Sequence, residues 1–180
     1  MIVLVGKSGT GKDTIKKELM KREYKSVVTY TTRPPREGEI DGVAYHFISS
    51  DDFLRKLASG FFAEFTSYNV STGDTWYYGT AKGDLTGDKV IIVNPSGLKA
   101  LYGLSELNAV VFLIETGDVI RMQRLIERGD DVEEIKRRIV TDDKDFLDVH
   151  KFVDTVIVND EESIEDIADV IVSRYREVLR

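Results

Sequence analysis

The sequence predicts an α/β fold built on a parallel β-sheet with helices on both faces. Short β-branched runs alternate along the chain with segments of helical periodicity, as they do where a crossover helix joins each strand to the next. The first strand-to-helix junction is glycine-rich, as in folds that bind phosphate at this place. The 180 residues are enough for one domain with a large buried core.

Apolar, β-branched runs predict the core strands, in chain order at Ile2–Val5, Ser26–Tyr30, Val90–Val93, Ala109–Ile114 and Thr155–Val158. A period close to 3.6 residues predicts helices at Lys12–Arg22, Gly97–Tyr102, Asp118–Arg128, Asp131–Phe146 and Ile164–Leu179. Two of these helices have start signals spaced as capping boxes, namely Asp130 with Glu133 and, more weakly, Ser163 with Asp166.

Residues 33–87 interrupt the alternation of strands and helices. The features of this stretch are, in order, Pro34-Pro35, a strand-like Tyr45–Ser49, a short helix after Ser50 that ends at Gly60, and the aromatic-rich Phe61–Thr80. We therefore expect a small subdomain inserted into the core.

Composition excludes several classes of function. There are 25 basic and 32 acidic residues, a formal charge of −7, so a general binder of nucleic acid or of anionic membranes is not expected. Without cysteine, disulfides and thiolate metal sites are excluded. Apolar runs are too short to span a bilayer, and the first residues enter a strand rather than a signal sequence. We expect a cytoplasmic protein.

The segment from Gly6 to Thr14 reads GKSGTGKDT and matches a phosphate-binding loop. Its glycines let the backbone curl so that N–H groups point at phosphate oxygens, and Lys12 reaches the outer phosphates. The last position departs from the pattern, because Asp13 replaces the usual hydroxyl residue. We expect ATP at Gly6, Lys7, Ser8, Gly9, Thr10, Gly11, Lys12, Asp13 and Thr14. The alternative is a glycine turn with a solvated lysine.

Three separated motifs carry a resemblance to a known family. They are Thr31-Thr32-Arg33-Pro34-Pro35-Arg36-Glu37-Gly38-Glu39-Ile40-Asp41-Gly42-Val43-Ala44-Tyr45-His46-Phe47, Phe62-Ala63-Glu64-Phe65 and Trp76-Tyr77-Tyr78-Gly79-Thr80. With the phosphate loop, this closely resembles the guanylate kinase family, whose members transfer a phosphoryl group from ATP to GMP. The resemblance implies a P-loop fold with a five-stranded parallel sheet. It places a single domain over 1–180, with a core of 1–32, 88–120 and 147–180, an NMP-binding subdomain of 33–87 and a lid region of 121–146.

The resemblance also assigns a GMP site. Arg33 and Arg36 are the expected clamp on the 5′-phosphate, with hydroxyl donors from Tyr45 and Tyr78. Glu64 is the expected reader of guanine, because one carboxylate can accept both N1–H and N2–H. The expected GMP-binding residues are Thr29, Arg33, Arg36, Tyr45, Glu64, Tyr78, Gly79, Thr80 and Asn94. The alternatives are a solvated basic loop for the arginines, core packing for the tyrosines and a surface acid for Glu64.

Catalysis is expected from Lys12 and three lid arginines, Arg124, Arg128 and Arg138, aided by Mg²⁺. Arg124 and Arg128 are four residues apart and share a helix face, where the alternative is salt bridges with acids such as Asp131 or Glu134. Arg138 is preferred over Arg137 because it precedes an apolar residue, as the lid arginine of the family does. Asp13 is the expected metal ligand, directly or through water.

The acceptor already carries a phosphate anion, so no general base is required. His46 and His150 are therefore expected to be structural or solvated.

Two further departures from the family keep the acceptor open. Asn94 stands where the family has an acidic residue, and Tyr68–Thr75 is longer than the usual segment and predicts a hairpin tip around Gly73-Asp74. We expect ATP and GMP or dGMP as ligands of a monomer or homodimer. The alternatives are a kinase of the same fold with another (deoxy)nucleotide or phosphosugar acceptor, and a non-catalytic interaction module, which usually lacks a working phosphate loop.

Overall fold

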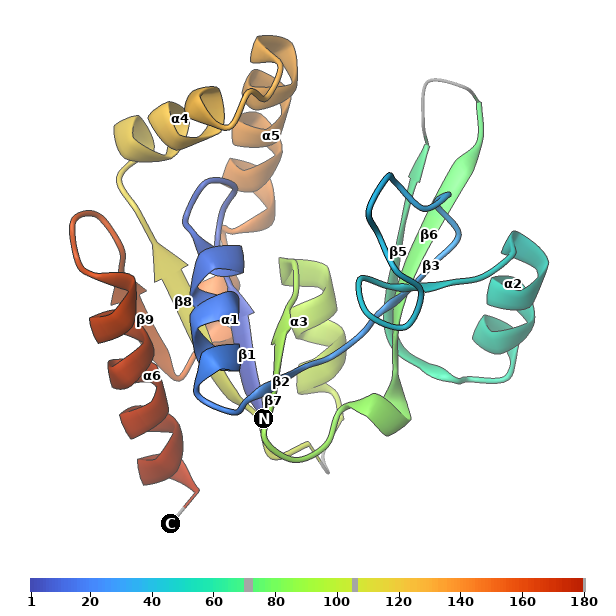
Figure 1. Ribbon diagram of the computed structural model, residues 1–180, viewed down its shortest axis with the longest axis horizontal. Helices are drawn as coiled ribbons and strands as arrows, with labels where there is room; N and C mark the ends of the chain where they lie inside the picture. Colours follow the sequence, from blue (N-terminus) through green and yellow to red (C-terminus); the bar gives the residue numbers. More distant parts are fainter. Residues whose placement is uncertain (70–72, 105–106, 180) are drawn as a thin grey trace. The chain divides into compact units, whose positions relative to one another are not determined.

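The computed structural model describes residues 1–69, 73–104 and 107–179 (Figure 1). The chain forms two compact units. The first contains Met1–Ser26, Asp88–Lys99 and Asn108–Arg180, and the second contains Val27–Gly87 and Ala100–Leu107.

A parallel sheet forms the centre of the first unit. Its strand order is β2 (Lys25–Ser26), β7 (Lys89–Ile92), β1 (Ile2–Val5), β8 (Val110–Glu115) and β9 (Thr155–Val158), and every neighbouring pair is parallel. The predicted five-stranded parallel sheet is thus confirmed. β1 lies in the middle of this sheet and is fully buried, so the loop that follows it starts from a rigid strand.

Helices α1 (Lys12–Lys21) and α6 (Ile164–Val178) pack on this sheet. The other described helices of this unit are α4 (Asp118–Glu127) and α5 (Val132–Asp145), which contact each other, with the first part of α3 (Pro95–Tyr102) and a 3₁₀ turn η2 (Val149–Phe152). α1 and α6 bury Leu19 and Ile171 in one apolar cluster with Leu4 and Phe112 of the strands. This packing holds the start of α1 at the carboxyl end of β1, where parallel α/β folds bind their ligands.

The second unit has a mixed sheet of order β4 (His46–Phe47), β3 (Tyr30–Thr31), β6 (Thr75–Ala81) and β5 (Phe62–Asn69), with α2 (Ser50–Ala58) and the 3₁₀ turn η1 (Lys82–Asp84). Phe53 of α2 is fully buried and stacks on Phe62 and Tyr77. β5 and β6 pair antiparallel up to Asn69 and Thr75. The predicted hairpin tip lies partly outside the described residues, because 70–72 are not among them.

Most predicted elements agree with the structure within two residues, and two predictions were wrong. The predicted strand Ser26–Tyr30 is divided, since Ser26 ends β2 in the parallel sheet and Tyr30 begins β3 in the other sheet. The predicted cap Asp130 is also wrong. Asp131 caps α5 by accepting the N–H groups of Glu133 and Glu134, while Asp130 pairs with arginines.

The cap at Ser163 is confirmed, because its hydroxyl accepts the N–H of Asp166 at 3.0 Å. Across the part of the chain that the structure describes, no helix is long and apolar enough to cross a membrane.

Candidate active site

The glycine-rich loop joins β1 to α1 and has the backbone curvature that the sequence predicts. Gly9 and Gly11 have φ values of 82° and 87°, in the left-handed region that favours glycine. The Lys12 ammonium donates to the carbonyl oxygens of Gly6 (2.6 Å) and Lys7 (2.8 Å), so the lysine folds back over the loop. Gly11 at the N-cap gives α1 no side-chain cap, so the N–H groups of the first turn can donate to an anion.

Asn159 fixes the second half of this loop. Its side-chain amide, 1% exposed, donates to the Thr10 carbonyl at 2.9 Å. A Cβ on Gly11 would lie only 2.5 Å from this amide nitrogen, so glycine is required at 11 for packing as well as for its φ. Asn159 follows β9 directly, which explains how a residue 149 positions from Thr10 reaches the loop.

Burial lowers the pKa of Lys12 to about 8, and the nearby cations Arg121 and Arg128 act in the same direction. Asp13 and Asp142 oppose the shift. Burial disfavours the charged form of Lys12, so its ammonium is stabilised when negatively charged phosphate oxygens replace neutral carbonyl oxygens as its partners. The electrostatics of the loop therefore favour binding of a polyanion.

The three predicted lid arginines all have oxygen partners, and two of them share one carboxylate. Arg124 of α4 donates to the carbonyl oxygens of Asn159 and Asp160, both at 3.0 Å, at the end of β9. Arg128 and Arg138 share the carboxylate of Asp130, with Arg138 at 3.3 Å, so the structure brings these two together. Hydrogen bonds from Arg137 and, to a smaller extent, from Arg138 lower the pKa of Glu134 to about 2.

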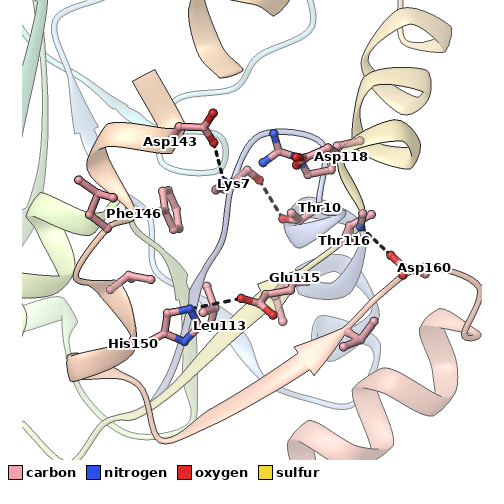
Figure 2. Close-up of a pocket in the computed structure, with 16 residues that line it drawn as sticks. Lys7, Thr10, Leu113, Glu115, Thr116, Asp118, Asp143, Phe146, His150 and Asp160 are labelled. Carbon is pink, nitrogen blue, oxygen red and sulfur yellow. Dashed lines mark hydrogen bonds and ion pairs between the residues drawn. The ribbon is translucent and has the colours of Figure 1, made fainter. Parts of the chain in front are cut away.

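Two acids of α5 contact the first half of the loop. The Ser8 N–H donates to Asp142 Oδ2 at 2.7 Å, and the Lys7 ammonium lies 2.6 Å from Asp143. Figure 2 shows Lys7 and Asp143 facing each other beside a pocket of about 550 Å³. Apolar side chains of β8, the end of α5 and η2 form part of its lining, and His150 approaches Glu115 at 3.5 Å.

The first turn of α1 offers hard oxygen donors to a cation. Asp13 and Thr14 are exposed beside Lys12. Among the described residues, no three His, Cys, Asp or Glu side chains cluster as a metal site. This donor set fits Mg²⁺ as kinases hold it, with one or two protein oxygens and the remaining ligands from phosphates and water.

In the second unit, Arg33 is the centre of a polar cluster. Its guanidinium is 4% exposed and donates to both oxygens of Glu39, at 2.7 and 2.9 Å. Glu39 raises the pKa of Arg33, with a smaller contribution from Tyr78. The guanidinium lies 5.4 Å from the ring centre of Tyr45, whose ring is 6.0 Å from that of Tyr78. Three of the predicted phosphate ligands thus lie together.

Glu64 and Thr80 face each other across the β5–β6 pair. The Thr80 hydroxyl, fully buried, donates to Glu64 Oε1. Burial raises the pKa of Glu64, and this hydrogen bond opposes the shift. A carboxylate oxygen has two lone pairs, so Glu64 can accept this hydroxyl and still accept donors from a base.

The remaining predicted GMP ligands have varied surroundings. Arg36 is exposed, and its N–H donates to Glu39. Thr29 is half-buried, and its carbonyl accepts the His46 N–H.

A Cβ on Gly79 would meet Phe53 and Phe62 at 2.9 Å, so glycine there makes room for the aromatic core. Asn94 belongs to the first unit and caps α3 by accepting the Gly97 N–H at 2.8 Å.

The residues of these clusters that were not predicted as site residues include Glu39, Arg121, Asp142 and Asn159. Arg121 stands one turn before Arg124 on α4, and that spacing was the only local signal for it. Asp142 contacts a loop 134 positions away, and no spacing within the sequence could reveal that contact.

Comparison with known proteins agrees with this geometry. A family model described as guanylate kinase matches residues 1–174. The guanylate kinase of Nitratidesulfovibrio vulgaris is 35% identical over 170 residues, covering 89% of this chain and 79% of that protein. That of Helicobacter hepaticus is 30% identical, covering 100% and 94%. The crystal structure of guanylate kinase from Anaplasma phagocytophilum has the same fold, with a TM-score of 0.63, 23% identity and coverage of 98% and 84%. The chain therefore belongs to the guanylate kinase family.

Proposed function

We propose that this chain transfers the terminal phosphoryl group of ATP to GMP or dGMP, giving ADP and GDP or dGDP. The observation that carries the proposal is the phosphate loop of a member of this family, in which the Lys12 ammonium donates to the carbonyl oxygens of Gly6 and Lys7. An interaction module has no need for a desolvated lysine on such a loop. The Glu64–Thr80 pair supports guanine as the acceptor base.

The residues have distinct tasks in this reaction. A phosphate oxygen of GMP attacks the terminal phosphorus of ATP while the bond to the bridging oxygen breaks and ADP leaves. Lys12 and the loop N–H groups hold the donor phosphates, and Arg33 and Arg36 hold the acceptor phosphate. Arg124, Arg128 and Arg138 would neutralise charge on the phosphoryl group in transfer.

Mg²⁺, held by Asp13 directly or through water, would neutralise the donor phosphates. We expect the subdomain of Arg33–Thr80 and the lid of Arg128–Arg138 to close when both nucleotides are bound.

A panel of acceptors tests the proposal. ATP and Mg²⁺ are incubated with GMP, dGMP, AMP, CMP, UMP and a phosphosugar, and ADP release is followed. GMP and dGMP are expected to give the largest kcat/KM. Equal rates with all nucleotides would contradict the specificity and leave the kinase activity standing, whereas ADP release with none of them would contradict both. We place the reaction in the cytoplasm, in a monomer or homodimer.

Arginines at the two phosphate sites should have separable kinetic effects. Arg36→Ala is expected to raise the KM for GMP about tenfold with kcat little changed, because its contact is made on binding. Arg128→Ala is expected to lower kcat about 30-fold, because its contact matters most in the transition state. Steady-state kinetics against GMP measure both.

Exposed arginines paired outside these sites provide the controls. Arg55→Ala on α2 and Arg174→Ala on α6 each remove an exposed ion pair and should leave both constants within about twofold of the wild type. A pure KM effect for Arg128→Ala would contradict its assignment to transfer.

The carboxylate at Asp13 should make nucleotide binding dependent on the metal. A negative group beside the triphosphate is unfavourable unless a divalent cation lies between them. Asp13→Ala is expected to weaken the Mg²⁺ dependence of ATP binding, and Asp13→Ser to retain it, because serine restores a hydroxyl ligand. Titration of ATP at several Mg²⁺ concentrations measures this without turnover. An unchanged dependence in Asp13→Ala would leave only a helix-dipole effect of about 0.3–1 kcal/mol.

A further inference from the structure

Arg121 has an environment that ion pairing alone does not explain. The side chain is 1% exposed, and within the described residues Nε, Nη1 and Nη2 have no hydrogen-bond partner. Its nearest acids are Asp118, at 3.4 Å from Nε, and Asp142, at 3.9 Å from Nη1. A buried guanidinium normally has most of its five donors satisfied, because leaving them unpaired costs free energy. Arg121 is thus a buried cation with acids nearby but without a hydrogen bond to either of them among the described residues.

The same residue adjoins the phosphate loop. A Cβ on Gly9 would lie 2.8 Å from the Arg121 carbonyl oxygen, so the backbones of loop and helix are in direct contact. Arg121 also lines the pocket with Lys7 and Thr10 of the loop, and its positive charge contributes to lowering the pKa of Lys12. A nucleotide bound at the loop would therefore have its phosphates near this guanidinium.

Asp142 links Arg121 to an anion-binding group of the loop. Its Oδ2 atom accepts the Ser8 N–H at 2.7 Å, a distance typical of a charge-assisted hydrogen bond. The N–H groups of a phosphate loop donate hydrogen bonds to phosphate oxygens. In this structure the Asp142 carboxylate accepts the Ser8 N–H where a phosphate oxygen would do so. The same Oδ2 is the atom that lies 3.9 Å from Arg121. A movement of about 1 Å toward Arg121 would convert this contact into a hydrogen bond.

We propose that Asp142 and Arg121 form a carboxylate-exchange pair: nucleotide phosphate displaces Asp142 from the Ser8 N–H, and Arg121 receives the displaced carboxylate. One movement then satisfies both the loop N–H and the buried guanidinium. Asp118 stays at the other end of Arg121, and Asp143 stays on Lys7, so the remaining charges keep their partners. The exchange couples occupation of the loop to the position of α5, which carries Arg138. It rests on the proposed function, since it needs nucleotide phosphates at the loop.

A double-mutant cycle tests the exchange. Arg121→Met, Asp142→Ala and the double variant are compared with the wild type for the Kd of ATP and of inorganic pyrophosphate, measured by titration calorimetry without GMP. Arg121→Met is expected to raise both Kd values about tenfold, because Asp142 loses its receiving partner and keeps competing for Ser8. In the Asp142→Ala background the same substitution should change Kd less than about threefold, since no carboxylate has to be received.

The outcomes separate the exchange from other roles of Arg121. A direct contact between Arg121 and phosphate predicts equal or greater weakening in the Asp142→Ala background, and a purely structural role predicts equal effects in both backgrounds; either result overturns the exchange. Asp143→Ala is the matched control, since it removes the neighbouring acid, whose ion pair is with Lys7. Arg121→Met should weaken binding in that background as it does in the wild type.

Two checks cover loss of folding and failure of the proposed function. Thermal unfolding is recorded for every variant, and Arg121→Lys replaces Arg121→Met if the latter does not fold. A crystal structure with pyrophosphate should show Asp142 within hydrogen-bond distance of Arg121 Nη1, and Asp142 still on the Ser8 N–H would overturn the proposal. If the wild type binds neither ATP nor pyrophosphate, both the exchange and the proposed function are contradicted. Binding without the predicted coupling overturns the exchange alone.

Discussion

Replacing Lys12 by methionine is expected to lower kcat for ADP formation by about 1,000-fold. Lys12 is the cation that folds over the loop, and removing one preorganised charge from a site of phosphoryl transfer costs about 10²–10³ in rate. Lys151→Met is the matched control, because Lys151 is exposed and pairs with Asp148 outside the loop. Its kcat should stay within about threefold of the wild type. Comparable losses in the two variants would show that Lys12 has no special role.

The pH dependence gives a second measurement on Lys12. Burial lowers its pKa to about 8 from the ordinary 10.5, so the free protein loses this charge as the pH rises through 8. The affinity for ATP should fall above that pH in the wild type and not in Lys12→Met. Unfolding of the protein would not explain a fall in ATP affinity above pH 8. Between pH 8 and 10.5 the unfolded chain binds more protons at Lys12 than the folded chain, so this group's contribution to the free energy of unfolding increases with pH.

Replacing Glu64 by glutamine is expected to reduce the preference for GMP over AMP, as a ratio of kcat/KM values, by about 1,000-fold. The carboxylate can accept two N–H donors of guanine, whereas the amide has one accepting end and a donor that opposes them. Because burial raises the pKa of Glu64, the charged form is costly in the empty protein. The neutral amide should therefore leave Tm unchanged or higher.

Acceptor kinetics and thermal unfolding measure the Glu64 prediction together. Glu37→Gln is the control, since Glu37 is an exposed acid of the same unit and should leave both the nucleotide preference and Tm as they are. A lower Tm with an unchanged preference would mean that Glu64 supports the sheet rather than reading the base.

Much of the fold was predictable because its signals are local. Strands β1 and β9 and the glycine loop follow from short runs of sequence, and the cap at Ser163 follows from a spacing of three residues. The cap of α5 shows the limit of this reasoning. Asp130 and Asp131 are adjacent acids, and the side chain that caps depends on which one the competing cations attract. Asp130 pairs with Arg128 and Arg138, and Asp131 is left to cap.

By itself, the sequence determined the fold class through periodicity and the phosphate loop through a short fixed spacing, and its resemblance to the guanylate kinase family indicated the polar residues of the second unit. Only the tertiary structure decided where one β-branched run divides between two sheets, and which partners hold the arginines of α4. It also placed Asp142 on the Ser8 N–H. The physical reason is that charged side chains take the nearest available partner in space, and packing of the whole chain sets that distance.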